Sequence, residues 1–464
     1  MSTDNIQVWD GIFPAVNPKA KFSGGDGTEF NPFLIADGTD LAQIATNIKN
    51  SEGAITYEGV YFKLSAHIEL NENPITPALV NVNTYGTAGY PTTVYEWVPI
   101  GGALAGDEDT GEVYFFKGDF NGNNKIISNA FYNHATPNPS SGHKDPVAEQ
   151  NSVGIFGCLG TGAKVYDLTT AGGFIAGSNS VGGIIGRSWG ATITNCTNGN
   201  FVYAIGANGT GGVAGTSWVF EPEQPTVANE VRPAINKCTN TGTVISNYTN
   251  NKGHRSGAAG GIVGENEGNV INCFNNGLVS GLFNAGGIVG SNQNKSSGDP
   301  SIIVTPGLIN NCYNWANIGT TSAVGGHIPG ITADCAGGII GYQTGNCQNA
   351  YNRGVITINP YTPPEPGPGI DTSPTIGQII GELNTVLSNS NDIFFNSDIH
   401  YLLGGTPSGG VGRDDHGASS CDAYEGDEIG LEDLTLALNN WVNGHNPSST
   451  YLNWIQDVNF WPVF

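Results

Sequence analysis

One short element recurs along the chain and limits what the chain can fold into. It consists of one or two glycines, two aliphatic residues and a further glycine, as in VGGIIG, AGGIVG and AGGIIG. Where the copies lie closest, they repeat every 26 to 29 residues. A period of this size is typical of solenoids and propellers, and three short strands fit into one interval. The repeat therefore predicts an all-β, right-handed parallel β-helix (a solenoid), in preference to a propeller with blades of about 40 residues.

A cysteine follows the glycine element in four of the repeats, next to an Asn or Lys. These residues are Cys196, Cys238, Cys273 and Cys312, and none of them belongs to a CxxC pair. Equivalent residues of stacked parallel strands lie about 4.8 Å apart, but their side chains point the same way, which disfavours a disulfide. The spacing therefore predicts a buried column of small apolar thiols.

Polar, proline-rich insertions separate some of the repeats. Two of them follow a glycine element and two precede one, so they are expected at two different corners of the stacked rungs. Insertions of this kind are where repeat proteins usually bind their ligands. The four segments are residues 217–234, 292–307, 247–259 and 321–335.

The pattern divides the chain into three parts of one continuous domain. Residues 1–150 are expected to form an N-terminal cap and the first rungs, 151–390 the repeat region with its corner loops, and 391–464 a last rung and a cap. Apolar residues at helical spacing predict a short amphipathic helix at 39–50 and another near the C-terminus that ends at Gly444. We therefore expect short capping helices at both ends.

Charge and composition exclude several classes of function. Only 12% of the residues are charged, and the net charge of −24 would repel nucleic acids and anionic membrane surfaces. No apolar run of about 20 residues is present for direct insertion into a membrane. The first residues, MSTDNIQVWDG, carry no signal-peptide pattern, yet the Gly-, Asn- and Ser-rich composition is typical of exported proteins. We expect a secreted or cell-surface protein from which the signal peptide has been removed.

The repeats also resemble a known family. The elements GGIVG and GGIIG, with the turns NCTNGN, NCFNNG and NCYNWAN, resemble GLUG-motif repeats, and flanking pieces such as WVPIG and FKGDFNGNNKIISN match as well. GLUG motifs are glycine-rich β-solenoid elements of bacterial surface and secreted proteins, and the chain resembles a complete module of the kind common in gut Bacteroidetes. The resemblance implies attachment to adhesins, surface proteins or peptidases whose catalytic domains lie elsewhere. It carries no catalytic residue over to this chain.

Candidates for catalysis are few. The chain contains no HExxH, GxSxG or Walker sequence. Parallel β-helices that degrade polysaccharides use carboxylates or a Lys or Arg in a lateral groove, and five aspartates are candidates for this role, although a plain turn or surface role explains them better. They are Asp119, Asp167, Asp334, Asp414 and Asp415.

Metal binding is supported only weakly. The acidic run Asp107, Glu108, Asp109 and Glu112 could hold calcium, but it lacks EF-hand spacing, and a solvated acidic loop explains it better. His416 and His445 follow no regular spacing and are expected at the surface. We therefore predict no cofactor and no defined metal site.

Three tryptophans are the best candidates for binding a ligand. Trp189, Trp218 and Trp315 lie just after a glycine element or at an Asn turn, where rung corners are expected. Exposed aromatic faces stack on sugar rings or anchor protein partners, although the same residues could instead fill corner gaps in the core.

These residues lead to a hypothesis of function with open alternatives. We predict a non-catalytic, extracellular cell-surface protein for adhesion or glycan binding, with glycans or host and cell-surface proteins as partners. The alternative is a polysaccharide-degrading lyase or glycosidase on the same scaffold. A structural spacer is a third reading, which caps at both ends would disfavour. The oligomeric state stays open.

Overall fold

The computed structural model describes most of the chain. The described residues are 8–49, 51, 55–77, 94–103, 113–133, 152–205, 209–220, 231–247, 257–281, 283–293, 306–319, 335–356, 375–377, 380–383, 390–396, 411–414, 419–424, 431–445, 450–457 and 462–464.

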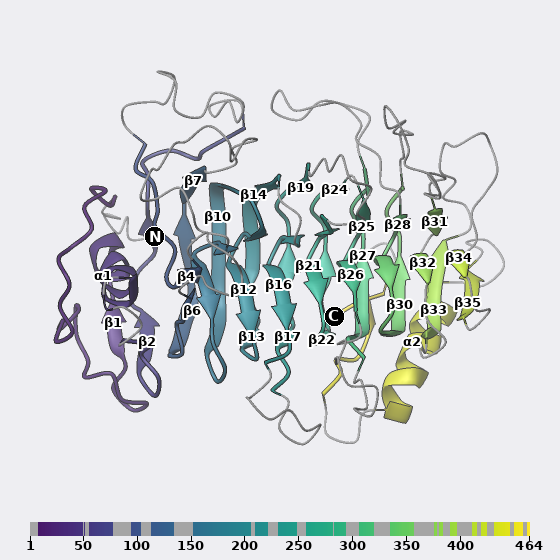
Figure 1. Cartoon of the computed structure of the whole chain (residues 1–464). Helices are drawn as coiled ribbons and strands as arrows, with labels where there is room; N and C mark the ends of the chain where they lie inside the picture. Colours follow the sequence, from purple (N-terminus) through teal and green to yellow (C-terminus); the bar gives the residue numbers. More distant parts are fainter. Residues whose placement is uncertain are drawn as a thin grey trace, which may run out of the picture.

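Helix α1 (Gly38–Lys49) forms where a short amphipathic helix was predicted. The Asp37 carboxylate accepts hydrogen bonds of 2.9 Å from the N–H groups of Thr39 and Asp40, which have no partner within the first turn. The apolar stripe of the helix is buried: Leu41, Ile44, Ala45 and Ile48. The helix lies over one end of the row of strands (Figure 1).

Strands make up three large parallel sheets and two small antiparallel pairs. The seven-stranded sheet contains β8 (Ser152–Val153), β11 (Ser180–Gly182), β15 (Thr210–Gly211), β20 (Ala259–Gly260), β25 (Asn284–Gly286), β28 (Cys335–Gly337) and β31 (Thr375–Gly377). The eight-stranded sheet contains β9 (Phe156–Leu159), β12 (Ile185–Trp189), β16 (Ala214–Trp218), β21 (Val263–Asn266), β26 (Val289–Asn292), β29 (Ile340–Gln343), β32 (Ile380–Leu383) and β34 (Val411–Asp414).

The largest sheet gathers 18 strands. They are β1 (Phe33–Ile35), β2 (Tyr61–Leu64), β3 (Ile68–Glu69), β6 (Asp119–Ser128), β7 (Phe131–Asn133), β10 (Lys164–Gly177), β13 (Thr192–Thr194), β14 (Thr197–Ala204), β17 (Ala234–Asn236), β18 (Thr239–Asn240), β19 (Val244–Ser246), β22 (Asn269–Ile271), β23 (Phe274–Asn275), β24 (Val279–Gly281), β27 (Leu308–Asn314), β30 (Asn346–Asn352), β33 (Ser390–Asn396) and β35 (Ser419–Tyr424). The antiparallel pairs are β4 (Gly102–Ala103) with β5 (Val113–Tyr114) and β36 (Ile455–Gln456) with β37 (Pro462–Val463).

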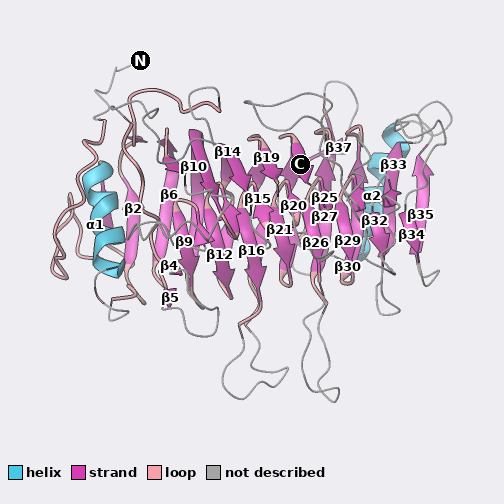
Figure 2. Ribbon diagram, turned by 45° about the horizontal axis from the view of Figure 1, so that its top comes forward, coloured by secondary structure: helices cyan, strands magenta, loops and turns pink. Residues whose placement is uncertain are grey.

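The chain passes through the three sheets in turn. It leaves β11, enters β12 and then β13 and β14, and returns to β15, which pairs in parallel with β11. We call one such passage a circuit. Successive circuits lie side by side along the long axis of the molecule (Figures 1 and 2).

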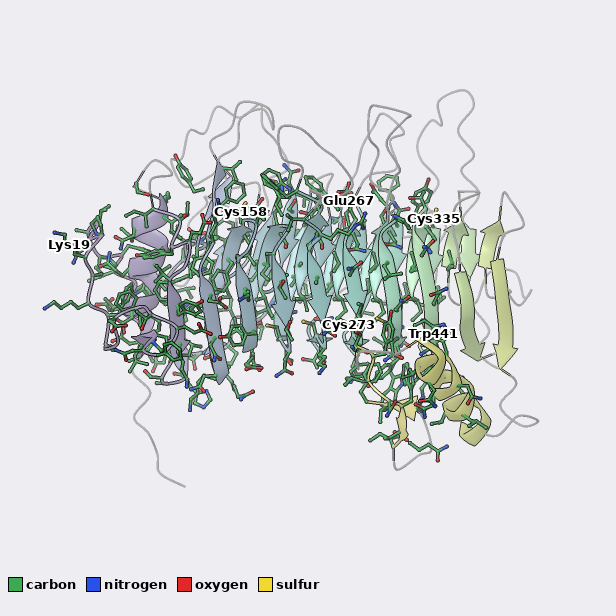
Figure 3. All side chains as sticks on the ribbon, turned by 90° about the horizontal axis from the view of Figure 1, so that it is seen from below. Lys19, Cys158, Glu267, Cys273, Cys335 and Trp441 are labelled. Atoms are coloured by element: carbon green, nitrogen blue, oxygen red, sulfur yellow. The ribbon has the colours of Figure 1, made fainter. Side chains whose placement is uncertain are left out.

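The predicted fold class, a right-handed parallel β-helix with short capping helices at both ends, is wrong. The strands do not repeat as one uniform solenoid, because they divide into sheets of 18, seven and eight strands with two antiparallel pairs added. The second helix, α2 (Leu431–His445), does form, but it packs beside the large sheet and covers no end of it. In Figure 3, Trp441 marks the side of α2 that meets the sheet.

The three predicted parts of the chain share one sheet. β10 pairs with β6 and β7 across residue 150, and β30 pairs with β33 across the boundary near residue 391. The residue bounds of the parts stay predictions.

Aliphatic and cysteine side chains fill the space between the sheets. One buried row across the large sheet contains Val165, Ile193, Ile235, Val270, Ile309 and Cys347. The predicted cysteine column is confirmed: Cys196, Cys238, Cys273 and Cys312 are all buried and unpaired.

A turn with positive φ precedes each cysteine of this column. The φ angle lies between 51° and 56° at these four turns and at the equivalent Asp167 and Asn349, a conformation that Asn and Asp tolerate better than most residues. Because the backbone is the same each time, the side chains leave the sheet in the same direction. We call this outward row the turn column: Asp167, Asn195, Lys237, Asn272, Asn311 and Asn349.

Candidate functional site

A groove of about 680 Å³ lies on the outer face of the large sheet, near the N-terminal end. Its floor is made by β2, β6, β10 and β13, and one rim by the loop before β1. The lining residues are Glu29, Phe30, Pro32, Tyr61, Phe62, Lys63, Asp119, Asn121, Lys164, Tyr166, Asp167, Thr192 and Thr194.

Strand register explains why these residues share one surface. Side chains of a strand alternate between the two faces of a sheet, and parallel neighbours keep equivalent residues about 4.8 Å apart. The interior positions hold apolar residues such as Phe120 and Val165, so the residues on either side of them point outward. Two outward rows result: Tyr61, Asp119, Lys164 and Thr192 in one, and Lys63, Asn121, Tyr166 and Thr194 in the other.

One ion pair crosses the middle of the groove. Lys164 Nζ lies 3.0 Å from Asp119 Oδ2. The hydrogen bond to Asp119 and the charge of Asp119 raise the pKa of Lys164. Partial burial, and then the same carboxylate, raise the pKa of Tyr166 above its usual value of 10.0. At neutral pH the groove therefore presents phenol O–H groups, the Lys164–Asp119 ion pair, further charged side chains, and amide and hydroxyl groups.

A second polar pair lies at the edge of the groove, in the turn column. Asn195 Nδ2 donates a hydrogen bond of 2.7 Å to Asp167 Oδ1. Asp167 is half-buried and Asn195 is exposed. The pair therefore offers a carboxylate acceptor and an amide donor to solvent.

The structure brings two of the five candidate carboxylates together. Asp119 and Asp167 line the groove, but Asp119 is already paired with Lys164. Asp414 belongs to β34 of another sheet, and Asp334 and Asp415 lie outside the described residues.

The calcium and histidine candidates cannot be placed. Asp107, Glu108, Asp109, Glu112 and His416 lie outside the described residues, and for His445 only the backbone of α2 is described. Within the described part of the chain, no three His, Cys, Asp or Glu side chains are grouped so as to hold a metal.

Two of the predicted tryptophans meet on the eight-stranded sheet. Trp189 and Trp218 are register partners on β12 and β16, and both are half-buried. The guanidinium of Arg187, which is only 4% exposed, lies 4.6 Å from the ring centre of Trp218 and 5.4 Å from that of Trp189. The two rings thus cover a buried cation on a sheet other than that of the groove.

Trp315 lies apart from them, at the contact between the large sheet and the C-terminal segment. Its indole N–H donates a hydrogen bond of 2.7 Å to the Tyr351 hydroxyl, and its ring meets Phe274 edge-on at 5.4 Å. Arg353 lies 5.0 Å from its ring centre. The three predicted tryptophans therefore do not form one site.

The groove residues Tyr61, Tyr166 and Lys164, and Asn195 at the groove's edge, were not predicted from the sequence. The stretch KVYDL alternates polar and apolar residues, which signals a strand with one outward face. Which outward residues become neighbours depends on the register between segments more than 25 residues apart, and no local pattern supplies it.

The comparisons with known proteins add little on function. No family model matches the chain, so the GLUG resemblance stays a prediction. A protein of Evansella cellulosilytica, provisionally named a Gly-rich membrane protein, is 27% identical over 172 residues, a stretch that covers 36% of this chain and 15% of the relative. A crystal structure provisionally named an immunoglobulin A1 protease, from Bacteroides ovatus, has a TM-score of 0.49 and 20% identity and covers 96% of this chain and 95% of its own. In the described residues, no helix has both the length and the apolar character that crossing a membrane requires.

Proposed function

We propose that this chain is a non-catalytic, secreted or cell-surface binding protein that holds its ligand across the groove. The single observation that carries the proposal is the groove itself. Aromatic, amide, hydroxyl and paired charged side chains from four parallel strands meet there on one open face. Ligand sites combine apolar contact area with a few directed polar groups in this way.

Rigidity of the floor supports a role in binding. Each strand of the floor is hydrogen-bonded to its neighbours, and the apolar row beneath it is fully buried. The outward side chains are therefore held at fixed spacing before a ligand arrives, which lowers the entropy cost of binding.

Extracellular location is part of the same proposal. The low share of charged residues and the net charge of −24 support an exported protein that relies on neutral polar side chains for its solubility. The relative from Evansella cellulosilytica carries a membrane-protein name, and it matches only 36% of this chain.

The test is a binding screen with a matched pair of variants. The chain is applied to a glycan array and to a panel of extracellular-matrix proteins, and hits are repeated with Tyr166→Ala. Phe220→Ala removes an aromatic side chain of 38% exposure outside the groove and serves as the control. We expect at least one ligand class whose binding is lost in Tyr166→Ala and kept in Phe220→Ala. Intact folding with no hit of either class would refute the proposal.

A polysaccharide-degrading enzyme is the second candidate, because Asp119 and Asp167 line the same groove. Against it, Lys164 already neutralises Asp119, whereas a general acid needs a carboxyl group that holds its own proton. Release of reducing or unsaturated ends from a polysaccharide panel, abolished by Asp167→Asn, would favour the enzyme.

A further inference from the structure

The chain's own C-terminal segment is bound to the same face of the large sheet as the groove. It passes over the turn column, where Leu452 N–H donates to Asn272 Oδ1 and Asn311 Nδ2 donates to Leu452 O, both at 3.0 Å. Asn272 Nδ2 also donates to Thr450 O at 2.9 Å. The two asparagines therefore recognise the peptide backbone, because together they bind both the N–H and the C=O of Leu452.

The same pair of side chains occurs next to the groove. In the occupied pair, Asn311 Nδ2 donates to Asn272 Oδ1 at 2.7 Å. Next to the groove, Asn195 Nδ2 donates to Asp167 Oδ1 at 2.7 Å. All four residues have φ between 54° and 56°, so the two pairs present their remaining donor and acceptor in the same way.

The two pairs differ in what covers them. Asn272 is 2% exposed and Asn311 is fully buried under the C-terminal segment, whereas Asn195 is exposed. Along the sheet, β13 of the groove pairs with β17, and β17 pairs with β22, which directly precedes Asn272. A single strand thus separates the open pair from the occupied one.

We propose that the ligand of the groove is an extended polypeptide. This inference rests on the proposed function, in which the groove is a binding site. One residue of the polypeptide donates its backbone N–H to Asp167 and accepts a hydrogen bond at its C=O from Asn195, as Leu452 does with Asn272 and Asn311. A carboxylate in place of the Asn272 amide strengthens the bond to the N–H, because a charge-assisted hydrogen bond is stronger than a neutral one.

The residues around Asp167 and Asn195 indicate which side chains this polypeptide carries. Tyr166, which directly precedes Asp167, provides apolar area beside the pair, so a bulky apolar side chain fits there. Glu29, Asp119 and Asp167 outnumber the cations Lys63 and Lys164 in the groove, and the whole chain carries a charge of −24. The preferred peptide is therefore neutral or basic, and acidic peptides are repelled.

The experiment selects peptides and then removes the amide donor. A phage library of random 12-residue peptides is selected on the full chain, and the best synthetic peptide is titrated by calorimetry. Asn195→Gly removes the side chain and keeps a residue that accepts positive φ. Asn276→Gly changes an exposed asparagine elsewhere on the sheet and is the control. We expect about tenfold weaker binding in Asn195→Gly, the value of one hydrogen bond, and less than twofold change in Asn276→Gly.

A second measurement tests whether the peptide is bound through one of its backbone N–H groups. A scan in which one peptide N–H at a time is methylated should reveal a single position where methylation weakens binding to the wild-type chain by about tenfold or more. Equal affinity of wild type and Asn195→Gly, or no such position, would overturn the peptide proposal.

The outcomes also distinguish this proposal from the one on which it rests. Glycans that bind and depend on Tyr166, with no peptide selected, would overturn the peptide class and leave the groove as a binding site. If no ligand of either class depends on Tyr166, both proposals fall.

Discussion

The Asn198 side-chain amide donates a hydrogen bond of 2.8 Å to Asn240 Oδ1, although neither residue has any exposed surface. The same bond, also 2.8 Å, joins Asn240 to Asn275, Asn275 to Asn314 and Asn314 to Asn352. Each amide further bonds the backbone two residues along its own strand. Burial of so many amides is tolerated because the inner asparagines of the row use both amide hydrogens and the amide oxygen in hydrogen bonds. The row ties five circuits to one register.

Replacing the central asparagine tests this row. Asn275→Ala leaves the Gly277 N–H and the Asn240 amide without their buried acceptor, and each such group costs about 1–3 kcal/mol. We expect the free energy of unfolding to fall by about 3 kcal/mol in urea titrations. Asn276→Ala, at the exposed neighbouring position, should change it by less than about 0.5 kcal/mol. Similar losses in both variants would contradict the role of the row.

The second glycine of the repeated pair makes room for the same asparagines. A Cβ on Gly183 would lie 2.0 Å from Asn198 Oδ1, and one on Gly212 would lie 2.4 Å from Asn240 Oδ1. Gly183→Ala should therefore lower the free energy of unfolding by about 3 kcal/mol or more. Gly444 in α2 has no atom within reach of an added Cβ, so Gly444→Ala should be neutral or stabilise by about 0.5 kcal/mol. Thermal denaturation of both variants distinguishes packing from a general intolerance of alanine.

Local sequence patterns predicted the strands, both helices and the buried cysteines, because each depends on residues close together in the chain. The apolar spacing from Leu41 to Ile48 extends over only about two helical turns, and Cys196 is identified by the turn beside it. The position of α2 was mispredicted because an apolar stripe does not say which surface covers it. Its partners, Tyr313 and Tyr351, are outward aromatics of distant circuits.

The candidate site was predicted only in part for the same reason. Asp119 and Asp167 were candidates by residue type, but their meeting depends on the pairing of β6 with β10. The positions of Trp189 and Trp218 in the sequence predict rings at rung corners. Nothing in the sequence pattern indicates that the buried charge of Arg187 lies beneath them. A one-residue change of register would have turned each of these side chains to the opposite face.

Because its thiols are buried, the protein should become less stable as the pH rises into the alkaline range. Burial is the largest cause that raises the pKa of Cys196, Cys238 and Cys273 well above 9.0. The unfolded chain, with thiol pKa values of about 8.5, therefore loses these protons first, and the free energy of unfolding should fall as the pH rises above about 9. Urea titrations between pH 7 and 10.5 measure this, and Cys238→Ala should reduce the slope.

Reactivity of the same thiols is a separate prediction. Seven cysteines of the described residues are buried: Cys158, Cys196, Cys238, Cys273, Cys312, Cys335 and Cys347. They should not react with 5,5′-dithiobis(2-nitrobenzoate) at pH 8 in the folded chain, and should all react in 6 M guanidinium chloride. Rapid reaction of any of them without denaturant would contradict their placement.

The charge of Asp119 should be visible in the titration of Tyr166. Desolvation first, and the nearby carboxylate second, hold the pKa of Tyr166 above 10.0. Asp119→Asn removes the negative charge that opposes the phenolate, so the pKa of Tyr166 should fall towards 10.0, as followed by NMR of the labelled ring. Asp26→Asn, in the N-terminal loop outside the groove, should leave it unchanged. Stability should change by less than about 1 kcal/mol in Asp119→Asn, because the Lys164 side chain of this ion pair is 54% exposed and such pairs contribute little.

Trp454 fixes the C-terminal segment to the large sheet. It is 2% exposed, its ring meets Tyr313 at 5.5 Å and Phe464 at 4.4 Å, and its backbone N–H and C=O are both bound by the Asn439 side chain of α2. Trp454→Ala removes a buried aromatic that contributes about 3–5 kcal/mol, and the hydrogen bonds of the circuits do not involve it. Hydrogen exchange followed by mass spectrometry should therefore show faster exchange at Leu452 and its neighbours, with β13 and β14 unchanged. Ile455→Ala, at a position of 58% exposure, should leave both regions unchanged. Faster exchange throughout the molecule would mean that the segment and the circuits unfold as one unit.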